Sequence, residues 1–230
     1  RKAHALPTDP RQRIVLAHFV GRMFGYRYLE VVLPDGTFRK IGKFHRSHSW
    51  TPRRFTLQSA RISPEDPLET NVARINSFKP EVIFGYGSYI GTLYRQAWER
   101  KLAIFRPKLI TYGSDRMADA DRLLIEDQFG VPVLSTYGAT ESIHIGFQCE
   151  RREGFHVGID DVAFRVVDGQ GRTLGPGDTG SSVISNLINR ATQDRKACQI
   201  LAKVGVRIPT FWMISYPFER TISGLSSHNT

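Results

Sequence analysis

The chain has 230 residues, of which 40% are hydrophobic and 23% are charged. This length and composition are typical of a globular protein with one large domain or two small ones, and they exclude a disordered chain. No run of about 18 apolar residues occurs, so we expect no membrane-spanning helix. Cys149 and Cys198 provide no disulfide framework, so we expect a reducing cytoplasm. The sequence begins at Arg1 without an initiator methionine, so we expect a piece of a longer protein.

The net charge of +10 is concentrated near the N-terminus. Residues 1–61 contain 13 basic and 3 acidic side chains, whereas the remaining residues contain 19 of each. A basic segment attracts phosphates, so one alternative is a nucleic-acid-binding protein acting through residues 1–61. No arginine-rich helix or aromatic–basic alternation accompanies the charge, which favours a solvated basic face instead.

Residues 1–61 are expected to form a basic, partial subdomain. Within them, residues 26–38 have the pattern of a hairpin, with Pro34-Asp35-Gly36 at its turn.

Local signals then predict helix boundaries in the middle of the chain. Ser63, followed by a proline and two acidic residues, has the pattern of a helix N-cap. Ser88 is placed to cap a second helix, and Gly130 is placed to end a third.

Short apolar runs between these helices predict three buried strands. The strands end at Gly85, Gly113 and Gly138, which are 28 and 25 residues apart. Strand–helix–strand units form parallel sheets with right-handed crossovers, and ligands bind beyond the carboxyl ends of their strands. We therefore expect an α/β nucleotide-binding core over residues 62–146, with three loops converging on one edge.

An antiparallel β extension is expected over residues 147–193. Residues 162–167 alternate in polarity, residues 168–171 read as a turn, and residues 182–187 read as a further strand. Residues 194–230 show no strong period, and we expect a divergent, poorly ordered tail.

The stretch Tyr137-Gly138-Ala139-Thr140-Glu141 contains groups suited to a nucleoside triphosphate. Tyr137 offers a flat face for a purine ring, and Gly138 lets the backbone approach a ligand closely. The Thr140 hydroxyl can donate to a phosphate oxygen, and Glu141 can hold a magnesium ion. A strand-to-helix turn in which Thr140 and Glu141 form a cap is the alternative.

The same stretch matches the Y-G-x-T-E signature of the adenylate-forming enzymes, and the chain most resembles their phenylacetate–coenzyme A ligase branch. The resemblance covers residues 62–193 and implies a fragment of the large N-terminal domain of such an enzyme. Four further stretches match in order: Arg74-Ile75-Asn76 to Pro80 with Gly85-Tyr86-Gly87-Ser88; Pro107 to Asp115; Gln148-Cys149 through Gly154-Phe155-His156; and Pro176-Gly177 through Asn186-Leu187 and Asn189-Arg190.

Enzymes of this family activate a carboxylic acid with ATP, giving an acyl-adenylate and pyrophosphate, and then transfer the acyl group to coenzyme A. The resemblance implies that Tyr137 and Gly138 pack against adenine and that Thr140 and Glu141 are catalytic. Thr140 would contact the phosphates, and Glu141 would ligate magnesium. The implied substrates are ATP, coenzyme A and a carboxylic acid of aryl or related type.

Two other loops gain roles from the resemblance. Gly113, Ser114 and Asp115 match the family's adenine-side loop. The resemblance also implies an acyl pocket near Tyr86, Gly87 and Ser88. The family usually has proline where this sequence has Gly87.

A zinc site is a further implication, because some members of the branch hold zinc in the region of Cys149 and His156. His144 is the third local candidate ligand. A zinc site needs about four nitrogen or sulfur ligands, so a buried cysteine and a hydrogen-bonded histidine are the alternative.

Two family motifs have no match in this sequence. Residues 1–61 contain no phosphate loop rich in Ser, Thr and Gly, and the resemblance stops after residue 193, before the family's ribose-binding Asp and its C-terminal domain with a catalytic Lys. We therefore expect an incomplete ligase core that is inactive alone. The alternative is a non-catalytic nucleotide-binding remnant on the same fold.

Overall fold

A computed structural model describes residues 10–34, 58–138, 145–158, 162–186 and 207–209. The chain divides into two compact units, residues 1–135 and residues 136–230. The division falls inside strand β5 (Val133–Tyr137). Among the described residues, no helix is long and apolar enough to cross a lipid bilayer.

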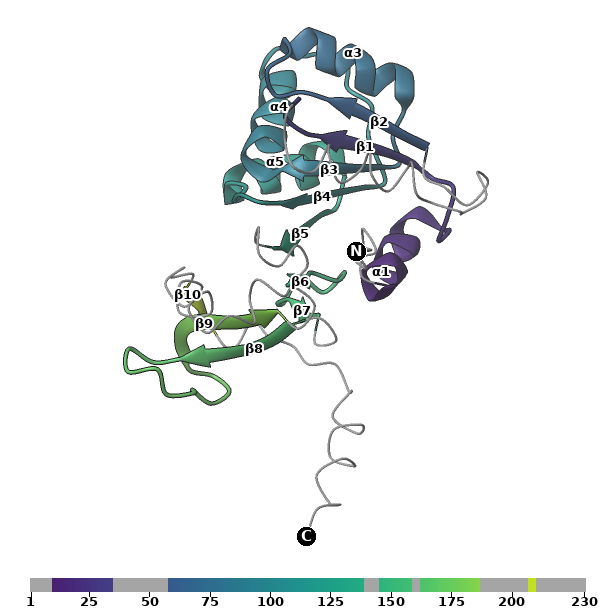
Figure 1. Cartoon of the computed structure of the whole chain (residues 1–230). Coiled ribbons are helices and arrows are strands. Elements are labelled where there is room, and N and C mark those ends of the chain that lie inside the picture. The colour runs from purple at the N-terminus through teal and green to yellow at the C-terminus, as the bar shows by residue number, and fades with distance from the viewer. Residues whose placement is uncertain (1–9, 35–57, 139–144, 159–161, 187–206, 210–230) are drawn as a thin grey trace. The chain divides into compact units, whose positions relative to one another are not determined.

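The first unit is built on a parallel sheet (Figure 1). Its strands besides β5 are β1 (Arg27–Val31), β2 (Gln58–Ile62), β3 (Val82–Tyr86) and β4 (Leu109–Gly113), and their order is β2-β1-β3-β4-β5. Across β3 and β4, Tyr86 lies opposite Gly113, and across β4 and β5, Tyr112 lies opposite Ser135. The three predicted strands are therefore adjacent and parallel, as expected, and they run toward the same edge of the sheet.

Helices cover both faces of this sheet. The helices α3 (Leu68–Phe78), α4 (Gly87–Glu99) and α5 (Asp119–Phe129) share one apolar core with Ile83 and Ile110 (Figure 1). Because successive strand residues point to opposite faces, Val82 and Leu109 lie on the other face. There they form a second core with Leu16 and Val20 of α1 (Pro10–Val20). The expected basic segment 1–61 thus contributes α1, β1 and most of β2 to the first unit.

Two predicted helix starts are wrong, whereas the predicted end of α5 is confirmed. Gly130 follows α5 in the left-handed conformation, with φ 65°. Ser63 instead forms a turn, in which its hydroxyl accepts from the Glu65 N–H at 3.1 Å, and α3 begins only at Leu68. Ser88 lies inside α4, which begins at Gly87.

The predicted hairpin over residues 26–38 is also wrong. Strand β1 pairs in parallel with β2 on one side and with β3 on the other, so both of its edges are occupied. The expected return strand lies within residues 35–57, outside the described part of the chain.

The second unit contains antiparallel pairings, which confirms the predicted antiparallel patch. Thr136 and Tyr137 pair with β6 (Gly146–Phe147), which pairs with β7 (His156–Val157). A further antiparallel sheet consists of β8 (Val162–Val167), β9 (Thr179–Asn186) and β10 (Arg207–Pro209), in the order β10-β9-β8. The predicted turn after β8 is present, because the Asp168 carboxylate accepts from the N–H groups of Gln170 and Arg172.

Candidate functional site

The start of α4, directly after β3, and the loop after β4 are joined by one carboxylate. Oδ1 of Asp115 accepts from the backbone N–H of Gly87 at 2.5 Å and lies 3.4 Å from the N–H of Ser88. The Ser88 hydroxyl donates to Oδ2 of the same carboxylate. These bonds link the start of α4 to a loop residue 28 positions after Gly87 in the sequence.

The contact depends on a glycine at position 87. A Cβ added there would lie 2.6 Å from Cδ2 of Tyr112 and 2.7 Å from the backbone N of Met117. The loop after β4 therefore packs directly on the Gly87 backbone. A side chain at this position, proline included, would not fit this packing.

The predicted acyl-pocket and adenine-side residues differ in their exposure. Tyr86 ends β3, is half-buried and packs against the apolar core. Gly113 is buried at the end of β4, whereas Ser114 and Asp115 are exposed. Ser114 adopts φ 69°, an uncommon conformation for a residue with a Cβ, and this turns the loop after β4.

The signature residues belong to the second unit. Tyr137 is half-buried, its carbonyl accepts from the Ile145 N–H at 2.9 Å, and its ring lies 6.2 Å from that of Phe155. Gly138 is the last described residue before the gap, and Thr140 and Glu141 lie outside the described residues. The roles of these residues, and the convergence of three loops, therefore stay predictions.

The candidate zinc ligands are only partly described. Cys149 is half-buried and carries a free thiol, and the ring of His156 lies 5.3 Å from that of Phe147. His144 lies outside the described residues. Among the residues that the structure describes, no group of three metal-binding side chains occurs. Zinc binding stays a prediction.

The matching stretch Arg74-Ile75-Asn76 has a structural role. The Asn76 amide donates to the Ala103 carbonyl at 2.7 Å, and its oxygen accepts from the Phe105 N–H at 2.6 Å. This side chain therefore fixes the loop between α4 and β4.

A second asparagine of α3 contacts α4. The Asn71 amide donates to the Tyr89 hydroxyl at 2.7 Å, and burial raises the pKa of Tyr89.

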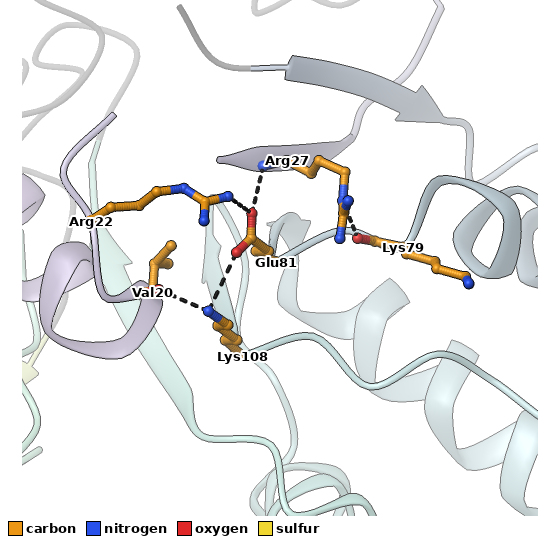
Figure 2. A network of polar contacts seen from close by, with 6 residues as sticks. All are labelled: Val20, Arg22, Arg27, Lys79, Glu81 and Lys108. Atoms are coloured by element: carbon orange, nitrogen blue, oxygen red, sulfur yellow. Dashed lines mark hydrogen bonds and ion pairs between the residues drawn. The ribbon is translucent and has the colours of Figure 1, made fainter. Parts of the chain in front are cut away.

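Figure 2 shows a polar network at the opposite, amino-terminal edge of the sheet, which the sequence patterns did not indicate. It is centred on Glu81, whose side chain is 9% exposed. The carboxylate accepts from the Arg22 guanidinium and from the Arg27 N–H at 3.1 Å, and lies 3.4 Å from the Lys108 ammonium. The signal in the sequence is weak: a charged residue directly precedes two of the strands, Glu81 before β3 and Lys108 before β4.

Several cations of the basic segment 1–61 have partners inside the fold. Arg22 contacts Glu81, and Arg27 Nε donates to the Lys79 carbonyl at 2.7 Å. Arg61 pairs with Glu30 at 2.6 Å. These three side chains stabilise the first unit, and much of the remaining positive charge lies in residues 1–9 and 35–57, outside the described part.

No family model and no curated protein sequence matches this chain. Solved structures do match. The chain is similar to 2-hydroxyisobutyryl-CoA ligase in complex with 2-HIB-AMP and CoA, with a TM-score of 0.58, 17% identity and coverage of 76% of this chain and 41% of that one. For the anthranilate CoA ligase AuaEII in complex with anthranoyl-AMP, the TM-score is 0.53 and the identity 13%, over 76% of this chain and 35% of that one.

The amide bond synthetase McbA from Marinactinospora thermotolerans is similar as well, with a TM-score of 0.59 and 13% identity over 87% of this chain and 40% of that one. The fold is therefore that of part of the N-terminal domain of adenylate-forming enzymes. The chain spans about two fifths of the length of 2-hydroxyisobutyryl-CoA ligase.

Proposed function

We propose that this chain is the core of an ATP-dependent enzyme that activates a carboxylic acid as an acyl-adenylate and transfers the acyl group to coenzyme A. One observation carries the proposal: the string Tyr137-Gly138-Ala139-Thr140-Glu141 begins at the end of β5, in a fold shared with enzymes crystallised with acyl-AMP or CoA. The string alone, or the fold alone, would be weaker support.

The proposed chemistry has two steps. First, a carboxylate oxygen of the acid bonds to the α-phosphorus of ATP while the bond from that phosphorus to the bridging oxygen breaks, so that pyrophosphate leaves. Then the thiolate sulfur of coenzyme A attacks the acyl carbon, and AMP leaves. The protein contributes orientation and stabilisation of charge at the α-phosphate.

In this proposal, Tyr137 and Gly138 bind adenine, and Thr140 donates a hydrogen bond to the phosphates. Glu141 supplies the kind of oxygen ligand that magnesium prefers when it also binds phosphate oxygens. Gly113 and Ser114 belong to the adenine-side loop. The acid binds near Tyr86.

The finer assignment is to the phenylacetate–coenzyme A ligase-like branch and to an aryl acid. Support comes from the matching stretches over residues 62–193 and from the similarity to a ligase that is crystallised with anthranoyl-AMP. We further propose that this chain alone binds nucleotide with little turnover, because its sequence contains neither the serine-rich phosphate loop nor the ribose-binding Asp.

A test is to incubate the full chain with ATP, magnesium and a panel of aryl and aliphatic acids, and to measure pyrophosphate release and acyl-AMP by mass spectrometry. We expect traces of aryl-AMP and near-background pyrophosphate release. Turnover comparable to that of intact ligases would contradict the proposed inactivity, and preferential use of aliphatic acids would contradict the aryl assignment. Complete absence of acyl-AMP, even with the enzyme in excess over the acid, would favour the non-catalytic nucleotide-binding remnant.

A further inference from the structure

The structure assigns Asp115 the role of a positioning residue: its carboxylate caps the N-terminus of α4 and joins the start of this helix to the loop after β4, and it is not a ligand of the nucleotide. The identity of the ligand rests on the proposed function. The cap itself rests only on contacts within the first unit.

Helix α4 needs an acceptor at its N-terminus, because the first backbone N–H groups of a helix have no partner within the helix. The residue at the N-cap position is Tyr86, and it makes no side-chain capping bond. Asp115 fills this need from another loop, with 2.5 Å between its Oδ1 and the N of Gly87. A carboxylate is the favoured cap, since the N-terminus of a helix carries partial positive charge.

The loop after β4 is shaped to present this carboxylate. Gly113 lies in register with Tyr86, so the loop leaves the sheet next to the start of α4. The left-handed Ser114 turns the chain, and Met117, 1% exposed, anchors the far side of the loop in the core. Asp115 therefore lies between two residues that the fold holds in place, Gly113 in the sheet and Met117 in the core.

Two consequences follow for a ligand. The N–H groups of Gly87 and Ser88 already face an internal anion, so this helix end repels a second anion such as a phosphate or a substrate carboxylate. Of the other exposed polar residues of this loop, Arg116 pairs with Asp119 at 2.8 Å, so Ser114 is the group that we expect to reach a ligand. Asp115 acts on binding by holding Ser114 in place.

The test uses the full chain, the variants Asp115→Ala and Asp115→Asn, and Asp119→Ala as a control. Asp119 is an exposed acid at the start of α5, just after this loop, and its carboxylate pairs with Arg116 at 2.8 Å. Amide hydrogen exchange at Gly87 and Ser88 is measured by NMR without ligand, and the affinity for AMP is measured by calorimetry.

We expect exchange at Gly87 and Ser88 to rise about fivefold to tenfold in Asp115→Ala, the effect of losing a helix cap. The rise should be smaller in Asp115→Asn, which keeps an acceptor oxygen, and absent in Asp119→Ala. AMP affinity should fall in the same order. If Asp115→Ala fails to fold, Asp115→Asn alone gives the comparison.

The outcomes separate the inference from the proposed function. Unchanged exchange in both Asp115 variants overturns the cap, and unchanged exchange with a large loss of AMP affinity would show a direct ligand instead. Faster exchange with unaltered AMP affinity overturns the positioning role. If the unaltered chain binds no AMP, the proposed function fails, while the exchange rates still decide whether Asp115 caps α4.

Discussion

Replacing Glu81 with alanine removes the centre of the network at the amino-terminal edge of the sheet, and we expect it to destabilise the first unit. Glu81 connects the end of α1, the start of β1 and the start of β4 through three partners (Figure 2). Without the carboxylate, the N–H of Arg27 loses an acceptor, and two cations lose their counter-charge.

The magnitude follows from how exposed the partners are. Breaking a fully buried ion pair costs about 3–5 kcal/mol, whereas an exposed pair is worth about 0–1 kcal/mol. The Glu81 side chain is 9% exposed, but those of Arg22 and Lys108 are 50% and 49% exposed and can regain hydration. We therefore expect a loss of about 2 kcal/mol in the free energy of unfolding, and about half of that for Glu81→Gln, which keeps an acceptor for Arg27.

The assay is urea unfolding of the full chain, followed by circular dichroism. The control is Glu69→Ala, because Glu69 pairs with Arg100 at 2.8 Å while both side chains are more than half exposed. This control should cost less than about 1 kcal/mol. Equal losses for Glu81→Ala and Glu69→Ala would refute the argument that burial makes the Glu81 network important.

Three further predictions concern the same unit. The Tyr94 hydroxyl is buried and has no hydrogen-bond partner among the described residues, so Tyr94→Phe should raise the free energy of unfolding by about 1 kcal/mol in the same urea assay. Gly87→Ala should lower it by about 1–3 kcal/mol, whereas Gly169→Ala, where a Cβ meets nothing within 4 Å, should change it little. Burial raises the pKa of Tyr94, so just above pH ~10 the Tyr94 hydroxyl ionises in the unfolded chain and stays protonated in the folded one. Stability should thus be full below that pH and fall above it, less steeply in Tyr94→Phe; a pH-independent stability up to pH ~12 would contradict this.

The parallel core was predictable because its signals are local. Each central strand is a short apolar run, and Gly130 ends α5 by adopting a backbone conformation that glycine favours. Neighbouring strands joined by a single helix then pair in parallel, as general topology requires.

The errors came from partners that are distant in the sequence. Serine is a residue type that often caps helices, so Ser88 was expected to cap α4, but the capping carboxylate comes from Asp115. The hairpin prediction assumed a neighbouring return strand, whereas Arg27 of β1 pairs with Gln58, and Tyr28 pairs with Val82. No local pattern reports such pairings.

The nucleotide site itself stays a prediction, because Thr140 and Glu141 lie outside the described residues. It rests on the string from Tyr137 to Glu141, in which Tyr137 and Gly138 suit adenine, and Thr140 and Glu141 suit phosphates and magnesium. The role of Asp115 was not visible, because an exposed acid after a strand looks alike whether it faces a ligand or a helix end.

The most direct test of the central claim, that this fold binds a nucleoside triphosphate through the signature residues, is calorimetry of ATP binding with and without magnesium. We predict that the chain binds ATP in a magnesium-dependent way and that Glu141→Ala weakens this binding about tenfold, which corresponds to ~1.4 kcal/mol. The exposed Glu153 of the same unit provides the matched control, and Glu153→Ala should leave the affinity unchanged. No ATP binding by the unaltered chain, or equal affinities for both variants, would contradict the account.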